Sequence, residues 1–328
     1  MPGSEVSAFW VAAPGRGELR SERLPSVQAG DVLVRTLFSG ISRGTEALVF
    51  RGEVPPGEYV RMRAPFQEGE FPGPVKYGYA NVGVVEQGPA ALLGKTVFCL
   101  YPHQTHYVVP AAAVHGVPDS TPAARAVLTA NLETALNGVW DATLQPGDRV
   151  AVIGAGVVGS LVAWLVRRTT ACEVVLIDLN PRREALAQAL DLPFSTPTVA
   201  ASQRPQQFDK IIHASGAPDG LLLALTLAAF EATIVEMSWY GNKRVPLPLG
   251  EAFHALRLTL KSSQVGSIAP SHRATWTYAR RLALALELLA DDRLDVLINS
   301  ESAFADLPAV MPRLAAAGGD VLCHRVIY

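Results

Sequence analysis

The segment RVAVIGAGVVGSLVAWLVRR, residues 149–168, constrains the fold of this 328-residue chain more than any other. An apolar, β-branched run leads into the pattern G-x-G-x-x-G, and an apolar run typical of a helix follows it. Gly154 permits a tight turn, Gly156 lets the backbone approach a pyrophosphate, and Gly159 lets the helix pack closely on the strand. The first N–H groups of the helix would face the anion. The segment therefore predicts a strand–turn–helix unit that binds a dinucleotide.

The next apolar segment, CEVVLID, ends in an acidic residue, Asp178. A carboxylate at the end of the second strand is placed to bond the adenosine ribose and to repel a 2′-phosphate. It favours NAD(H), although Arg182 and Arg183 lie close enough to leave NADP(H) open. A methyltransferase and a turn that binds nothing are the alternatives for this motif. The expected cofactor-binding residues of this unit are Gly154, Gly156, Val157, Val158, Gly159, Asp178, Leu179 and Arg183.

Strand-like segments continue to alternate with helical ones further along the chain. They are FDKIIHASG (208–216), ATIVEMSWYG (232–241) and RLTLKSSQVGS (257–267). Alternating strands and helices predict a parallel sheet. Residues 121–267 are therefore expected to form a doubly wound Rossmann domain. Within 208–216, Ser215 and Gly216 are expected to contact the cofactor, because ligands bind at the carboxyl ends of such strands. His213, inside the same strand, is expected to be a hydrogen-bonded core histidine.

The front of the chain, residues 1–120, has short β-type segments separated by Gly and Pro, which predicts a compact, barrel-like unit. Helices are expected over 121–142 and 274–292, and a closing strand over 319–328. A long irregular stretch, 50–75, interrupts the front unit, and loops of that length are usually functional. Its aromatic and cationic residues suggest a lining for an anionic or sizeable substrate: Tyr59, Arg61, Arg63, Phe66 and Phe71.

Composition excludes several classes of protein. Hydrophobic residues make up 49% and charged residues 18%, which suits a large core and excludes a disordered chain. The net charge of −2 and the scattered basic residues exclude a nucleic-acid footprint. No apolar run is long enough to cross a bilayer, and no signal peptide is recognisable. The three cysteines lie far apart, which argues against a disulfide framework and indicates a reducing cytoplasm.

Taken in order along the chain, these segments resemble the medium-chain dehydrogenase/reductase superfamily over nearly the full length. They are GDVLVRTLFSGIS, KYGYANVGVVEQG, GKTVF, HYVVPAAAV, the Gly154 turn, FDKIIHASGAPDGLLLAL and VEMSWYGNKRVPLPL. The resemblance implies an α/β chain with a GroES-like, β-barrel-type catalytic domain in residues 1–120, completed by 268–328, and a Rossmann domain in 121–267. It also implies hydride transfer with a nicotinamide cofactor and a homodimer or homotetramer.

Members of the superfamily with catalytic zinc carry a Cys, a Gly-His-Glu turn and a third ligand before the dinucleotide fold. Zinc binds through thiolate, imidazole and carboxylate ligands. None of these ligands stands at the corresponding positions, which hold Ser42 or Arg43, Tyr79, Ala80 and Ala130. Glu46 and Glu133 are nearby carboxylates that we interpret as non-ligands because no His partner is evident. The sequence therefore predicts no zinc site.

The segments GISRGTE and GYANVG are similar to those of the branch that includes bacteriochlorophyllide hydroxyethyl dehydrogenases. Ala80 and Asn81 depart from that branch, so the resemblance concerns the subfamily and not the substrate. The resemblance places Thr45 where relatives have a hydroxyl proton relay, and Arg43 where some members reach the cofactor pyrophosphate. Tyr79 stands at a former ligand position and is the candidate proton donor. For Tyr79 the alternative is aromatic packing, and for Thr45 a local turn hydroxyl.

The expected function is therefore a zinc-independent oxidoreductase that transfers hydride between NAD(H) and a carbonyl, alcohol or activated alkene. Two alternatives stay open. One is an NADPH-dependent quinone or enone reductase that needs only ordered water for protonation. The other is a dinucleotide-binding protein without turnover. Lys76 and Tyr77, which flank the turn before Tyr79, are expected at the surface near the entrance.

Overall fold

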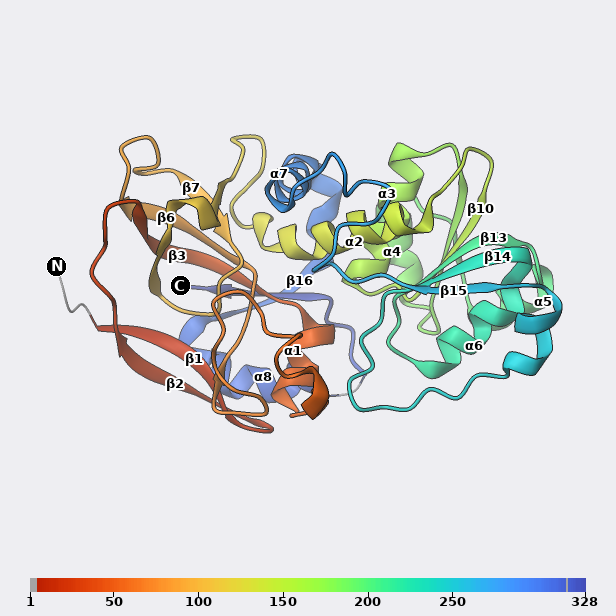
Figure 1. Ribbon diagram of the computed structural model, residues 1–328, viewed down its shortest axis with the longest axis horizontal. Coiled ribbons are helices and arrows are strands. Elements are labelled where there is room, and N and C mark those ends of the chain that lie inside the picture. Colours follow the sequence, from red (N-terminus) through yellow and green to blue (C-terminus); the bar gives the residue numbers. More distant parts are fainter. Residues whose placement is uncertain (1–4, 317) are drawn as a thin grey trace. The chain divides into compact units, whose positions relative to one another are not determined.

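The computed structural model describes residues 5–316 and 318–328 and divides into two compact units, each described by itself here (Figure 1). Unit 1 contains the chain up to Ala130 together with Leu282–Tyr328, and unit 2 is Asn131–Arg281. The junctions lie inside or beside helices, whereas the sequence placed them at 120 and 268. Changes of composition mark loops and not helix interiors, which explains why the two sets of boundaries differ.

Unit 2 is built on a six-stranded parallel sheet with the order β12-β11-β10-β13-β14-β15. Figure 1 shows β10, β13, β14 and β15 side by side. Its strands are β10 (Arg149–Ile153), β11 (Glu173–Ile177), β12 (Phe194–Ser195), β13 (Phe208–His213), β14 (Ala228–Glu236) and β15 (Thr259–Ser262). Its helices are α2 (Thr129–Ala142), which begins at the junction, α3 (Val157–Thr169), α4 (Arg183–Ala189), α5 (Pro197–Gln203) and α6 (Pro218–Leu227).

The central strands of this sheet are nearly continuous apolar runs because helices cover both faces. The chain goes from β10 outward to β12 on one side and from β13 outward to β15 on the other. The strand order therefore reverses between β10 and β13, and ligands of open α/β sheets bind at that switch point.

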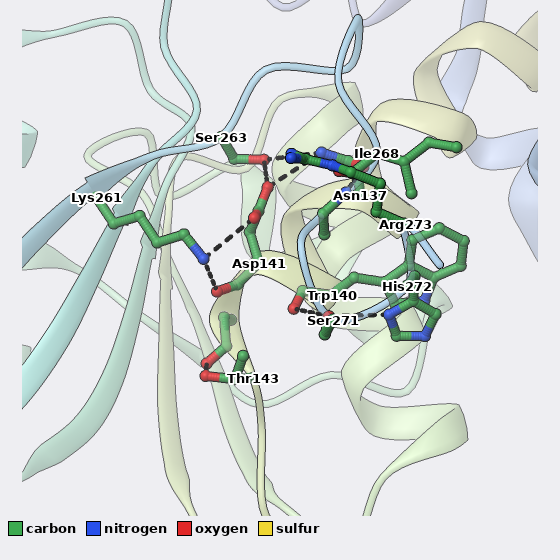
Figure 2. A network of polar contacts seen from close by, with 12 residues as sticks. Asn137, Trp140, Asp141, Thr143, Lys261, Ser263, Ile268, Ser271, His272 and Arg273 are labelled. Carbon is green, nitrogen blue, oxygen red and sulfur yellow. Dashed lines mark hydrogen bonds and ion pairs between the residues drawn. The ribbon is translucent and has the colours of Figure 1, made fainter. Parts of the chain in front are cut away.

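A polar network joins the edge strand of this sheet to helix α2 (Figure 2). The Asp141 carboxylate lies 3.1 Å from Nζ of Lys261 and accepts a 2.7 Å hydrogen bond from Ser263. The amide of Asn137 donates to the same carboxylate at 3.0 Å. Trp140 stacks on His272 with ring centroids 4.1 Å apart. These contacts fix β15 and the segment after it against α2.

Unit 1 is rich in β-structure and contains two sheets, one with the order β2-β1-β5-β4 and one with β16-β17-β3-β6-β7-β9, in which β8 also pairs with β3. The strands are β1 (Glu5–Ala13), β2 (Arg16–Arg23), β3 (Asp31–Ile41), β4 (Glu68–Gly69), β5 (Val75–Lys76), β6 (Asn81–Gln87), β7 (Thr96–Cys99), β8 (His106–Pro110), β9 (Val114–Gly116), β16 (Ile298–Ala303) and β17 (Cys323–Ile327). The helices are α1 (Arg43–Phe50), α7 (Tyr278–Leu288), which crosses the second junction, and α8 (Leu307–Ala315).

The expected fold class is confirmed: a β-rich barrel-type unit accompanies a Rossmann sheet. Two expected helices are shorter than the sequence pattern suggested. The first begins only at Thr129, after a 3₁₀ turn, and the hydroxyl of Thr121, the expected cap, donates to the Leu286 carbonyl. The other begins at Tyr278 and ends at Leu288. Among the described residues, no helix is long and apolar enough to cross a membrane.

Candidate functional site

The glycine turn after β10 closes directly on the end of β13. Gly154 has φ of +107°, and a Cβ atom there would lie 2.7 Å from the backbone nitrogen of Ser215. A Cβ atom on Gly159 would lie 1.9 Å from the carbonyl oxygen of Gly154. Both positions therefore require glycine, one for backbone conformation and both for space. The contact of Gly154 with Ser215 places the two expected cofactor segments side by side at the switch point.

Helix α3 begins beside open space. Gly156 is its N-cap residue, no side chain caps the helix there, and a Cβ atom at Gly156 would meet nothing within 4 Å. The first N–H groups of such a helix attract an anion through their hydrogen bonds and the helix dipole. Val157 and Val158 follow in the first turn, both partly exposed. This geometry fits the pyrophosphate of a dinucleotide.

Asp178 lies at the end of β11, beside the glycine turn. Its Oδ2 accepts a hydrogen bond from the Ala155 N–H at 2.7 Å, and its Oδ1 accepts one from the Asn180 N–H at 2.8 Å. These two bonds fix the carboxylate and leave lone pairs for ribose hydroxyls. Leu179 is 78% exposed at the same strand end, and Arg183 begins helix α4. The residues expected to hold a dinucleotide are thus gathered at one edge of unit 2.

The end of β13 carries a cluster of polar side chains behind Ser215. His213 is fully buried, as expected from the sequence. Its Nδ1 lies 2.7 Å from Oε2 of Glu236, and its Nε2 lies 2.5 Å from Oγ of Ser215. The Tyr240 hydroxyl also donates to Glu236, at 3.0 Å. Sequence reasoning missed Glu236, because the end of the next parallel strand gave no local signal of its partner.

In unit 1, the Tyr79 hydroxyl lies within hydrogen-bonding reach of the Ser42 and Thr45 side chains. Burial raises the pKa of Tyr79 to about 12, the charge of Glu46 adds to the rise, and the two hydroxyls oppose it. Tyr79 is therefore a neutral hydrogen-bond donor at physiological pH. Thr45 lies in the first turn of α1, and the structure thus brings the two catalytic candidates together.

A buried hydrogen-bond partner for Glu46 lies beside this cluster. Oε2 of Glu46 lies 2.8 Å from Nε2 of His103, and Oε1 accepts a hydrogen bond from the Ser42 N–H. Nδ1 of His103 lies 2.7 Å from Oγ of Ser39. The interpretation that Glu46 has no His partner is wrong, because strands distant in sequence place His103 against α1. Glu133, by contrast, pairs with buried Arg281 in unit 2.

Comparisons with known proteins identify the fold. A zinc-binding dehydrogenase candidate from Sinorhizobium meliloti 1021, bound to NADP, matches 99% of this chain and 100% of its own at 19% identity, with a TM-score of 0.78. A protein from Escherichia coli CFT073 described as a short chain alcohol dehydrogenase, in complex with NADH, matches the same shares at 17% identity and a TM-score of 0.78. The protein has the medium-chain dehydrogenase/reductase fold.

A curated relative supports the same resemblance in sequence. The D-guloside 3-dehydrogenase of Escherichia coli K12 is 24% identical over 311 residues, which cover 86% of this chain and 88% of that enzyme. No family model matches the chain.

The positions that hold zinc ligands in medium-chain enzymes carry other residue types in this protein. The positions expected for ligands hold Ser42 or Arg43, Tyr79, Ala80 and Ala130. The ligand-type side chains beside them are Glu46 and His103, which are hydrogen-bonded to each other. Across residues 5–316 and 318–328, no three His, Cys, Asp or Glu side chains gather in a group that could hold a metal. These residues do not fit a catalytic zinc ion.

Arg43, a cofactor candidate by analogy with medium-chain relatives, contacts the loop before β17. Its guanidinium donates to the carbonyl oxygens of Val321 at 2.6 Å and of Gly318 at 2.9 Å. These bonds give Arg43 a role in fixing that loop. A contact with the cofactor pyrophosphate stays a prediction.

Lys76 and Tyr77 are buried, so their expected surface placement is wrong. Lys76 is 1% exposed, and its Nζ lies 2.7 Å from Glu22 and 2.8 Å from Oε1 of Gln104. A buried ammonium needs such partners, and no local pattern indicates them because they come from β2 and the turn before β8. Beside Lys76 lies a cavity of about 380 Å³.

The long loop 50–75 holds its own charges. Arg61 pairs with Glu58, and Arg63 pairs with Glu70. Two of its aromatic residues, Tyr59 and Phe71, form part of a continuous row with neighbouring ring centroids 5.7 to 5.9 Å apart, whereas Phe66 packs against Tyr101. The row consists of Tyr59, Phe71, Tyr77 and Tyr79. The loop thus supports Tyr79 through aromatic packing by way of Tyr77. A cationic substrate lining stays a prediction.

Proposed function

We propose that this protein is an oxidoreductase that binds a nicotinamide dinucleotide at the edge of unit 2 and exchanges hydride with a carbonyl or alcohol substrate. The observation that carries the proposal is the contact of the Gly154 turn with Ser215, beside Asp178 and the uncapped start of α3. Solved structures of the same fold bind NADP or NADH, which supports the cofactor class.

Each residue at the proposed dinucleotide-binding edge of unit 2 has a defined role in this proposal. The N–H groups at the start of α3 bind the pyrophosphate, and Gly156 leaves the space for it. Asp178 accepts hydrogen bonds from the adenosine ribose hydroxyls and repels a 2′-phosphate, which favours NAD(H) over NADP(H). When bound, the nicotinamide supplies or accepts hydride at its C4 atom.

Proton transfer is assigned to Tyr79, with Thr45 beside it. Because its pKa is raised to about 12, Tyr79 stays protonated and can donate to the oxygen of a carbonyl as that oxygen gains charge. The same property makes Tyr79 a poor base at neutral pH. The proposed reaction is independent of zinc, since the residues at the ligand positions offer no thiolate or imidazole.

For the substrate, we propose a secondary alcohol of a sugar or polyol, or the corresponding ketone. The support is the D-guloside 3-dehydrogenase relative and a D-xylulose reductase candidate from Arthroderma otae, which is 25% identical over 228 residues. Activated alkenes remain in the test, because a reductase of that class needs no acid beyond water. We further propose a cytoplasmic homodimer or homotetramer, which light scattering of the purified protein tests.

The test combines cofactor titration with a substrate panel. NADH and NADPH are titrated by calorimetry, and turnover is then followed at the nicotinamide absorbance with sugars, polyols, their ketones and enones. The proposal predicts tighter binding of NADH and turnover with a polyol or ketosugar. Tighter binding of NADPH with turnover of enones alone would favour a quinone or enone reductase. Tight NADH binding without turnover anywhere in the panel would favour a non-catalytic dinucleotide-binding protein.

A further inference from the structure

The side chains behind Ser215 form a hydrogen-bonded chain that ends at the surface. It runs from Glu236 through the fully buried ring of His213 to Oγ of Ser215, with distances of 2.7 Å and 2.5 Å. Ser215 itself is exposed and packs against Gly154 of the glycine turn. These hydrogen bonds therefore connect a partly buried carboxylate to the edge at which a dinucleotide is expected.

When the His213 imidazole is neutral, the hydrogens of this hydrogen-bonded chain have one consistent arrangement. The Glu236 carboxylate is surrounded by donors, namely the Ser238 N–H at 2.7 Å, the Tyr240 hydroxyl at 3.0 Å and Nδ1 of His213. Burial opposes ionisation, but the bonds from His213 and Ser238 outweigh it and lower the pKa of Glu236. Glu236 is thus an acceptor only, and Nδ1 of His213 carries the hydrogen.

This arrangement fixes the hydroxyl of Ser215 as well. In a neutral imidazole whose Nδ1 carries the hydrogen, Nε2 is an acceptor, so Ser215 donates its hydrogen inward to His213. Oγ of Ser215 also accepts from the Ala217 N–H at 3.2 Å. The oxygen has one lone pair left, and it can serve only as an acceptor towards the outside.

Gly220, in the first turn of α6, keeps the space that this chain needs. A Cβ atom at that position would lie 2.4 Å from Nε2 of His213 and 2.5 Å from Oγ of Ser215. Any larger residue would therefore separate the two atoms. The requirement for glycine here comes from the hydrogen bond, since a helix interior otherwise disfavours glycine.

We propose that His213 and Glu236 are positioning residues for the cofactor, which orient Ser215 as a fixed acceptor for a hydroxyl group of the dinucleotide. This inference rests on the proposed function. A hydroxyl donor gains from an acceptor whose own hydrogen already points elsewhere, because no reorientation is needed on binding. A phosphate, which offers only acceptors at this place, gains nothing from it. The chain thus adds to the preference for hydroxyl groups that Asp178 provides.

The test is a binding cycle that needs no substrate. NADH is titrated into the wild type, Ser215→Ala, Glu236→Gln and the double variant. Each single variant is expected to weaken NADH binding by about three- to ten-fold, the effect of one lost hydrogen bond. The double variant is expected to bind as weakly as Ser215→Ala alone, because Glu236 acts through Ser215. The inference would be overturned if the fold losses of NADH affinity in the two single variants multiplied in the double variant. It would also be overturned if Glu236→Gln did not change NADH affinity.

A second pair of variants leaves every polar residue in place. Gly220→Ala is expected to weaken NADH binding by about the same factor as Ser215→Ala. Its control is Gly250→Ala in the same unit, where a Cβ atom would meet nothing within 4 Å and where no change in binding is expected. Unchanged NADH binding by Gly220→Ala would contradict the proposed role of the hydrogen bonds among Glu236, His213 and Ser215. A wild type that binds neither NADH nor NADPH would instead refute the proposed function.

Discussion

His103 and Glu46 form a buried hydrogen-bonded pair beside Ser42, whose N–H donates to Oε1 of Glu46. Nε2 of His103 lies 2.8 Å from Oε2 of Glu46, and the side chains are 2% and 4% exposed. The residues come from the turn before β8 and from helix α1, so the pair joins two elements of unit 1 that lie far apart in the sequence. We infer that it stabilises this part of unit 1.

Breaking this pair is expected to destabilise the protein strongly. Glu46→Gln and His103→Asn should each lower the free energy of unfolding by about 2–4 kcal/mol, because each leaves a buried partner unsatisfied. The double variant should lose much less than the sum. Urea unfolding of the four proteins measures the coupling. The exposed pair of Arg257 and Glu231 is the control and should couple by less than about 1 kcal/mol. Additive losses at Glu46 and His103 would contradict the account.

Gly78 is expected to tolerate no side chain, because His103 occupies the space. Its φ is +141°, and a Cβ atom there would lie 2.9 Å from Cδ2 of His103. Gly78→Ala should therefore cost more than about 2 kcal/mol of unfolding free energy. Gly94→Ala is the matched control, because Gly94 has φ of +71° but open space around it, and it should cost only about 1 kcal/mol. Equal losses in the two variants would show that backbone strain alone matters at Gly78.

Tyr79→Phe tests the proposed proton donor. The variant should lower kcat by about 100-fold or more, because it removes the donor and keeps the ring packed against Tyr77. NADH affinity should not change, since Tyr79 belongs to unit 1 and the residues proposed to bind the dinucleotide belong to unit 2. Tyr77→Phe is the control and should retain most activity. Stopped-flow and steady-state rates with a substrate from the panel provide the measurement, and an unchanged kcat would return Tyr79 to a packing role.

His324 makes stability depend on pH. Burial, and then the charges of His103 and Arg313, lower its pKa from 6.5 to about 4. As the pH falls from 6.5 towards 4, His324 therefore binds a proton in the unfolded chain but not in the folded protein. Stability is full above about pH 6.5 and should decrease by up to about 3 kcal/mol as the pH approaches 4. His324→Gln should flatten the curve of urea midpoint against pH, and a difference curve without slope would contradict the expectation.

Local patterns predicted some of these features and could not predict others. The strand, turn and helix around Gly154 follow from neighbouring residues, so the sequence identified them and the fold class correctly. The partner of Glu46 lies 57 residues away, and it becomes visible only after β3, β6 and the turn before β8 are assembled. Lys76 was misplaced for the same reason, because its partner Glu22 lies on β2. Contacts between distant elements, which no periodicity reports, decide which charged residues are buried.

We propose that the open space at Gly156 holds the pyrophosphate of a nicotinamide dinucleotide. Gly156→Asp fills that space with a carboxylate, while its φ of −78° and its N-cap position suit Asp and should leave stability unchanged or slightly higher. Calorimetric titration of NADH into folded wild type and Gly156→Asp is the most direct measurement. We expect the wild type to bind NADH and the variant to bind NADH at least about 100-fold more weakly. Equal affinity in the two proteins, or no binding by the wild type, would contradict the proposal.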